Sequence, residues 1–371
     1  MLSCGVPRDH VLGQASDYEL FCALCEAMPN LVGHPLYDES HWELEYVFDC
    51  SLEINKDNCG RIWQMTAERL RADTLSPTTV LAKAGVRRMC TPYHPWDTLP
   101  ERRQDDPVER LPIFCPDGGM ELWQGTPDWM RQLSRASGVT CSDWESVCEA
   151  YRRVLDAFHV AGCRMALHTM SLDGFSVPNA YGANHAIQGF AAHGASDAEG
   201  ERTFGMMLLR FLMTEYERRG WTMELRLRGG GAWEHLLRYA QKDRGWQWPR
   251  TVLSCTSFRH REQTNRIYAQ LAAEQSVGLG GVVTSDHWEM DSVTEEIRAW
   301  AAYSPLGMYP GLRTHLGGVG CLWQHQRFRL SLCKLVAQWH RERELSWGEN
   351  GSLELLERVC FSNAYRMTDP K

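Results

Sequence analysis

Histidine and aspartate side chains stand at or just past the ends of several short apolar segments in this sequence. They are His94, His168, Asp286, His287 and His315. If those segments are parallel strands, their carboxyl ends meet at one edge of the sheet, and imidazole and carboxylate groups gathered there could hold zinc. With fourteen histidines in the chain, polar loop residues that fall there by chance are the alternative interpretation.

Two arginines could instead bind an acidic ligand. Arg226 and Arg228 lie two residues apart in an apolar segment, so in a strand their side chains would share one face. Guanidinium groups on an interior face would suit the carboxylate of an acidic sugar. Glu224 falls on the same face, and a structural salt bridge with it is the alternative.

Cysteine usage and charge exclude several classes of protein. Cys22 and Cys25 form a CxxC within a helical pattern, which favours core packing over a metal or redox site. The fourteen cysteines are expected to be reduced thiols, since the chain shows no export signal, and we therefore expect a cytoplasmic protein. A net charge of −8 argues against nucleic acid, and no segment is apolar enough to span a membrane.

The elements that must position these residues alternate along most of the chain. Residues 1–85 are expected to be mostly helical, with helices near 17–28 and 57–72 and a third that starts at Ser76-Pro77. Seven apolar segments are expected to be strands, at 86–93, 111–117, 163–170, 222–229, 250–257, 278–285 and 306–312. Helices are expected between them, near 126–138, 142–161, 201–219, 231–243, 260–276 and 290–303, and after them near 322–343 and 352–365.

This alternation predicts a parallel α/β fold. A doubly wound sheet and a (β/α) barrel both fit, although no GxGxxG follows the first strand to favour the dinucleotide-binding version. A closed barrel of this type needs eight strands, and seven are found.

Several stretches match, in order, the motifs of one known family. HPLYDESHWELEYVF at 34–48 is similar to PLYxxTHLELxxYF, LPIFCPD at 111–117 to LPTFRPD, and RRGWTMELRLRGG at 218–230 to RGWVMQLHIGALR. Further matches are VRRMCTPYHPWDTL, HVAGCRMALHTM, QHQRFRLSLCKLVAQWHRERE and VCFSNAYRM. On these matches the chain resembles the uronate isomerases.

The resemblance implies a distorted TIM-type (β/α) barrel of the amidohydrolase type, here residues 86–371, with a small helical subdomain at 1–85. The family interconverts aldose and ketose uronates: D-glucuronate with D-fructuronate, and D-galacturonate with D-tagaturonate. It usually employs a divalent metal, here expected to be zinc or manganese. The reaction needs a base, a group that polarises the carbonyl, and an anchor for the carboxylate.

Several family positions are altered in this chain. The HxH of the family's first strand and a following His-Tyr pair would precede Met1, so we expect that strand and two metal ligands to be missing. Cys115 stands at the arginine of FRPD, Leu167 at the aspartate of SDHG and Arg226 at the histidine of LHIG. Arginine has no lone pair to offer a metal.

The remaining motifs are altered as well. His287 and Trp288 stand at a pair of tryptophans, so that one of the pair is retained. His315 and Gly317 fall where TDSRSF supplies an aspartate and an arginine, and Arg313 lies two residues before His315.

Candidate roles follow from the resemblance and the altered positions. The catalytic candidates are His315, Arg313 and His168, and the substrate-binding candidates are Trp288, Arg226 and Arg228. The candidate ligands of a rebuilt metal site are His168, His287, His315 and Asp286.

Two functions from different classes follow. One is uronate isomerisation, with a small acidic sugar as substrate. The other is a non-catalytic barrel homologue that binds a ligand or another protein. A barrel without its first strand would leave unpaired strand edges, so we expect a poorly soluble chain, or one that covers the edge with its own N-terminal helices or with a partner, such as a second copy in a homo-oligomer.

Overall fold

The structure is a computed structural model that describes residues 1–13, 15–72, 75–101, 105–117, 128–170, 175–194, 196–227, 236, 239–240, 242–243, 246–255, 261–273, 279–285, 290–314, 319–346 and 348–369. The chain divides into two compact units. The N-terminal unit comprises Met1–Arg87, Trp288–Asp291 and Thr314–Leu330. The sheet unit comprises Arg88–His287, Ser292–Arg313 and Ser331–Lys371.

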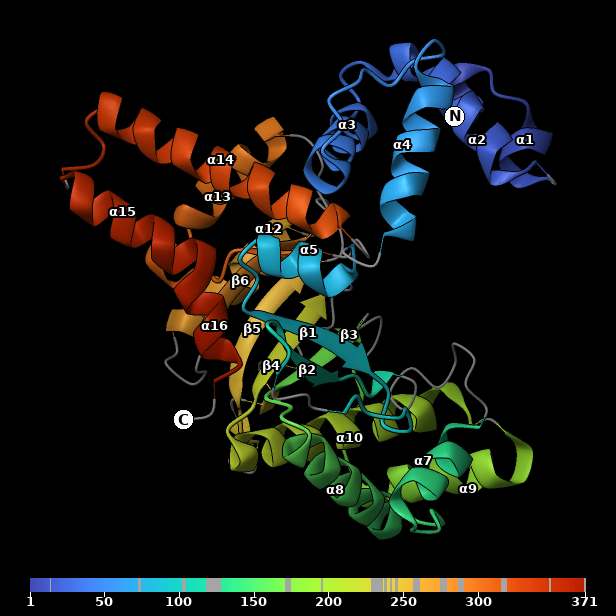
Figure 1. Cartoon of the computed structure of the whole chain (residues 1–371). Helices are drawn as coiled ribbons and strands as arrows, with labels where there is room; N and C mark the ends of the chain where they lie inside the picture. The colour runs from blue at the N-terminus through green and yellow to red at the C-terminus, as the bar shows by residue number, and fades with distance from the viewer. Residues whose placement is uncertain are drawn as a thin grey trace. The chain divides into compact units, whose positions relative to one another are not determined.

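The helices agree with most of the expected ones (Figure 1). They are α1 (Arg8–Leu12), α2 (Asp17–Ala27), α3 (Pro35–Phe48), α4 (Cys59–Arg71), α5 (Pro77–Lys83), α7 (Trp129–Ser137), α8 (Trp144–Val160), α9 (Ala180–His193), α10 (Ala198–Arg219), α12 (Arg261–Ala273), α13 (Met290–Ala301), α14 (Gly320–Arg341), α15 (Glu349–Glu357) and α16 (Asn363–Met367). Short 3₁₀ helices cover Leu2–Cys4, Met28–Leu31 and Leu306–Met308, and a π-helical turn covers Arg358–Ser362. Among the described residues, no helix is long and apolar enough to cross a bilayer.

In the N-terminal unit, helix starts follow the expected capping chemistry. Ser76 caps α5 by accepting a hydrogen bond from the backbone N–H of Thr79, and Pro77 takes the first helical position. His41 fixes the segment after α3, because its Nδ1 lies 2.7 Å from the carbonyl oxygen of Tyr37 and its Nε2 accepts from the backbone N–H of Ile54. The block at 34–48 is therefore structural.

Seven parallel strands form the sheet, and they pair in chain order (Figure 1). They are β1 (Arg88–Tyr93), β2 (Glu109–Phe114), β3 (Met165–Met170), β4 (Thr222–Leu227), β5 (Arg250–Cys255), β6 (Leu279–Ser285) and β7 (Leu312–Arg313). A doubly wound sheet would reverse its order at a switch point. Strict sequential pairing is the order found in a (β/α) barrel.

The seventh strand was predicted wrongly. It was expected at 306–312, but Leu306–Met308 forms a 3₁₀ helix, and only Leu312 and Arg313 pair with β6. Pro310 has no backbone N–H to donate to a neighbouring strand. Gly311 has a φ of 86°, which is outside the strand region. The apolar residues of this segment therefore form a turn, and Arg313 joins the sheet directly after it.

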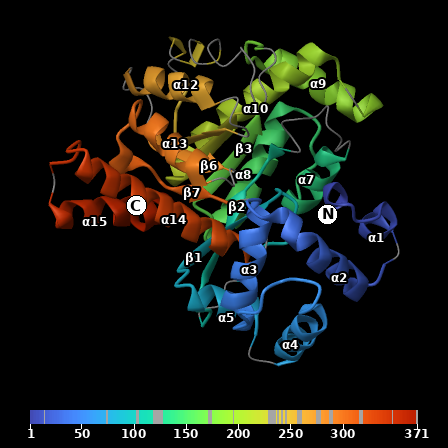
Figure 2. The same ribbon diagram turned by 90° about the horizontal axis from the view of Figure 1, so that it is seen from above.

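Alternation along the strands separates two environments in the sheet unit. One face carries an apolar cluster of Ile113, Cys115, Met165, Leu167 and Val252. We call this the interior face, as in a barrel. The opposite face is covered by α8 and α10 (Figure 2).

On that covered face, the ring of Phe114 packs edge-on against Phe158 of α8 and Tyr216 of α10. His168 is fully buried there, and its Nε2 lies 3.0 Å from the Tyr216 hydroxyl.

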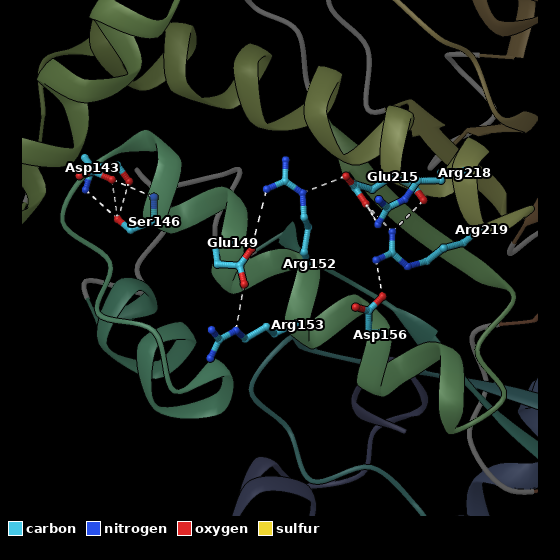
Figure 3. Close-up of polar contacts among 9 residues, drawn as sticks. All are labelled: Asp143, Ser146, Glu149, Arg152, Arg153, Asp156, Glu215, Arg218 and Arg219. Atoms are coloured by element: carbon cyan, nitrogen blue, oxygen red, sulfur yellow. Dashed lines mark hydrogen bonds and ion pairs between the residues drawn. The ribbon is translucent and has the colours of Figure 1, made fainter.

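A buried carboxylate joins the two covering helices (Figure 3). Glu215 of α10 is 5% exposed, and its Oε1 accepts a hydrogen bond from Nε of Arg152 of α8 at 3.2 Å. Arg218 and Arg219, from its own helix, approach the same carboxylate at 2.8 and 2.5 Å. Arg219 also bridges to Asp156 of α8 at 2.5 Å. These ion pairs hold α8 and α10 together as one layer.

The amino ends of the strands are held by the last described residues. Arg88 of β1 donates to the Thr368 hydroxyl at 2.6 Å and lies over the ring of Tyr365. The Thr222 hydroxyl of β4 donates to the carbonyl oxygen of Met367 at 2.9 Å. This end of the sheet is therefore covered, and the polar interior residues lie toward the carboxyl ends.

Helix α9 was not expected from the sequence, because it contains two glycines, which disfavour a helix, and lacks a strong apolar stripe. Its small residues allow close packing against α10. A Cβ on Gly182 would lie 2.6 Å from Cγ2 of Thr203, which is buried in α10.

We predict that Gly182→Ala destabilises the protein by about 1–3 kcal/mol, because the added methyl group overlaps Thr203. Gly60→Ala in the first turn of α4 is the matched control, since its nearest atom would be 3.6 Å away. That change should be neutral or stabilising by up to about 1 kcal/mol. Denaturant unfolding followed by circular dichroism measures both. Equal stability of the two variants would contradict the tight α9–α10 contact.

We predict that His168 makes stability fall with acidity. Burial lowers the pKa of His168 from 6.5 to about 3, so the folded protein keeps it neutral while the unfolded chain takes up a proton below pH 6.5. Stability is then lost as pH falls from about 6.5 toward 3. Between pH 7 and 5 this loss is about 2 kcal/mol. Urea unfolding at both pH values should show a smaller pH effect in His168→Asn, and an unchanged difference would refute the burial effect.

Candidate functional site

A charged cluster lies on the interior face toward the carboxyl ends of β4, β5 and β7. It consists of Glu224, Arg226, Ser254 and Arg313, which we call the arginine–glutamate cluster. Glu224 is 4% exposed, and its Oε1 accepts a hydrogen bond from the Ser254 hydroxyl at 2.8 Å. The same oxygen pairs with the guanidinium of Arg313 and lies 3.9 Å from that of Arg226.

Strand geometry explains why these residues meet. Glu224 and Arg226 are two apart on β4, so they share a face, and Arg226 is in register with Ser254 on β5. Arg313 arrives from β7, where it pairs with Ser285. The sequence indicated the Glu224–Arg226 pairing as the structural alternative, and it is present.

Electrostatics keep Glu224 ionised. Burial by itself would raise the pKa of the carboxyl group, but Arg313 and Arg226 outweigh it, and the pKa is lowered from its ordinary value. The carboxylate is therefore a poor proton acceptor at neutral pH. Its chemical role is to hold guanidinium groups in the interior.

Arg313 also reaches the position at which the family arginine is replaced. Cys115 is buried, and burial raises the pKa of its thiol to about 12. The positive charge of Arg313 lowers the pKa of the same thiol, so the guanidinium group of Arg313 lies near Cys115. A guanidinium group is thus present near Cys115, although it comes from a different strand.

The nearby Asp117 accepts a hydrogen bond from the backbone N–H of Thr169 at 3.3 Å, and Asp97 accepts from that of His94 at 2.7 Å. Asp97 therefore caps the turn after β1, and Asp117 holds the segment after β2 to β3. His94 is exposed and stacks on Trp96.

The predicted site residues do not all fall within the described part of the chain. Arg226 and Arg313 are brought together. His168 lies on the face opposite Leu167, against Tyr216, and not beside the arginine–glutamate cluster. The others lie outside the described residues: Arg228, Asp286, His287, Trp288 and His315.

A metal site finds no support in the residues that the structure describes. No three histidine, cysteine, aspartate or glutamate side chains gather there in a way that could hold an ion. His168, the one described member of the predicted ligand set, is buried on the helix-covered face. The metal prediction therefore depends on Asp286, His287 and His315.

Ser254 and Tyr216 were not singled out from the sequence. Ser254 sits in an ordinary strand, and its only signal is that it faces the same side as the charged pair on β4. Tyr216 lies in an amphipathic helix, where an aromatic residue predicts packing and nothing more specific. The roles of both residues can be assigned only when the positions of the neighbouring strands and helices are known.

Comparisons with known proteins agree with this geometry. A family model described as glucuronate isomerase matches residues 1–246. A uronate isomerase from Bacillus velezensis is 25% identical, and the match covers 98% of this chain and 85% of the relative. One from Salmonella paratyphi B is 27% identical with the same coverage.

A solved structure has the same fold. The uronate isomerase of Thermotoga maritima superposes with a TM-score of 0.84 at 17% identity, covering 99% of this chain and 86% of that one. The family match extends over well more than half of the chain, and the sequential parallel sheet agrees with the fold. The chain belongs to the glucuronate isomerase family.

Proposed function

We propose that this chain catalyses the aldose–ketose interconversion of a hexuronate, D-glucuronate with D-fructuronate or D-galacturonate with D-tagaturonate. Membership of the glucuronate isomerase family supports the reaction class. The observation that carries the proposal for this chain is the arginine–glutamate cluster, which holds two guanidinium groups on the interior face.

The substrate carboxylate is the group that these arginines suit. A guanidinium carries five N–H donors in a planar fork and can bind two carboxylates at once. The Arg313 side chain is 18% exposed, so a ligand can reach it while Glu224 holds its other edge. Arg313 then serves the anchoring role of the arginine that Cys115 replaces.

Proton transfer between C2 and C1 needs a group whose pKa lies closer to neutrality than that of Glu224. We assign it to His315, which follows Arg313 by two residues in the sequence. His168 fits this role poorly, because burial lowers its pKa to about 3 and it faces Tyr216. Trp288 and Arg228 remain proposed substrate contacts.

A divalent metal and a cytoplasmic location belong to the same proposal. A metal at the strand ends would polarise the substrate carbonyl. The location rests on the abundant cysteines, since those described are free thiols. Homo-oligomerisation stays a prediction.

The direct test is isomerisation of glucuronate and galacturonate by the purified chain, with and without zinc or manganese. We expect turnover of at least one uronate, and a drop in kcat/KM of about 100-fold in Arg313→Gln, because a charged carboxylate contact is lost. Arg153→Gln is the matched control, since Arg153 is also ion-paired but lies on the surface of α8. Absence of turnover under all conditions would refute the isomerase and favour the non-catalytic barrel.

A second prediction tests the cluster without any assay of activity. Glu224→Gln should destabilise the protein by roughly 3–5 kcal/mol, because the partly buried guanidinium groups of Arg313 and Arg226 lose the negative charge of Glu224. Adding Arg313→Gln should restore at least about 1 kcal/mol, since one of those charges is then removed. Denaturant unfolding of the two single variants and the double variant measures the coupling. Additive losses would show that Glu224 and Arg313 do not stabilise each other.

A further inference from the structure

Three thiols meet in the N-terminal unit. Cys22 and Cys25 come from α2, and Cys59 is the first residue of α4. The Sγ atoms of Cys22 and Cys59 are 2.8 Å apart. Cys25 packs in the same apolar cluster as Cys59. The CxxC was expected to pack in the core, and it does so, but the spacing gave no sign of the third thiol.

The sulfur separation is short enough for a covalent bond to form. A disulfide has an S–S length of about 2.0 Å, so closing the gap between Cys22 and Cys59 needs a shift of roughly 0.8 Å. Small side-chain rotations can supply such a movement. Cys22 and Cys25 lie three residues apart on one face of α2, so a link between them is the competing outcome of the test.

We propose that Cys22 and Cys59 form a reversible disulfide that clamps α2 to α4. The pair is separated by 37 positions in the sequence, so the bond would close a loop that contains α3. Such a crosslink restricts the unfolded chain and opposes local opening of the two helices. The N-terminal unit thereby acquires a stability that depends on the redox state.

The oxidant we assign is a small-molecule disulfide. The thiolate of Cys22 attacks one of its sulfur atoms, which forms a mixed disulfide and releases one small thiolate. Cys59 then loses its proton and attacks the Cys22 sulfur, which closes the protein disulfide and releases the second thiolate. The two protons leave with the two small thiols, so one disulfide is reduced for each one formed.

Exposure assigns the order of these steps. Cys22 is partly exposed, whereas Cys59 is 5% exposed. Burial also raises the pKa of Cys59 to about 12, so it remains a neutral thiol until the mixed disulfide lies beside it. Cys22 is thus the entry thiol and Cys59 the resolving thiol.

The test uses the full chain treated with oxidised glutathione, denatured in N-ethylmaleimide, digested without reductant and analysed by mass spectrometry. We expect a linked pair of peptides that carry Cys22 and Cys59, lighter than their sum by two hydrogen atoms. The link should be absent from Cys22→Ala and from Cys59→Ala. Cys25→Ala and Cys148→Ala are the matched controls and should keep it, since Cys148 is a buried thiol of α8.

Limited proteolysis tests the clamp itself. Cleavage within residues 1–87 should slow on the order of tenfold or more after oxidation and return to its original rate with dithiothreitol. Cys22→Ala should fold normally, because Cys22 is only partly buried, and should show no response. Recovery of Cys22 as a glutathione adduct or linked to Cys25, or a crosslink that leaves the cleavage rate unchanged, would overturn the proposal.

Discussion

Alternation of side chains along parallel strands is the constraint on which the rest of this structure depends. Two residues at successive positions of a strand face different environments. A shift of one residue along the strand therefore moves a side chain from the interior face to the face covered by helices. Leu167 and His168 illustrate the consequence. The first lies in the interior cluster, and the second is buried against Tyr216. Position near a strand end therefore does not by itself make a residue part of the site.

Two buried carboxylates in this protein have similar partners and different surroundings. Glu215 is ringed by arginines in the layer of α8 and α10, where it joins helices (Figure 3). Glu224 also meets arginines, but on the interior face toward the carboxyl ends of the strands, where parallel α/β folds bind their ligands. The chemistry of the ion pairs is the same, and the location separates a structural brace from a candidate binding site.

The sequence was informative wherever local pattern decides the structure. Six of the strands were expected within a few residues of their positions, because each is a compact apolar run. The prediction of the seventh strand was wrong because Pro310 and Gly311 prevent this apolar segment from forming a strand. Helix α9 was missed because its small residues allow close packing against α10, which cannot be predicted from the sequence of α9 alone. The Glu224–Arg226 pair follows from spacing, but Arg313 joins it across a separation of 89 positions, which only the sheet brings together.

The contacts of the last described residues with β1 and β4 have a consequence for synthesis of the protein. Arg88 and Thr222 form hydrogen bonds with groups at Tyr365, Met367 and Thr368. These partners lie 277 and 280 positions after Arg88 and 145 positions after Thr222. Because a ribosome makes the chain from the amino end, β1 and β4 are synthesised long before the residues that bind their amino ends. The sheet unit can therefore complete its packing only after the segment around Met367 has been made.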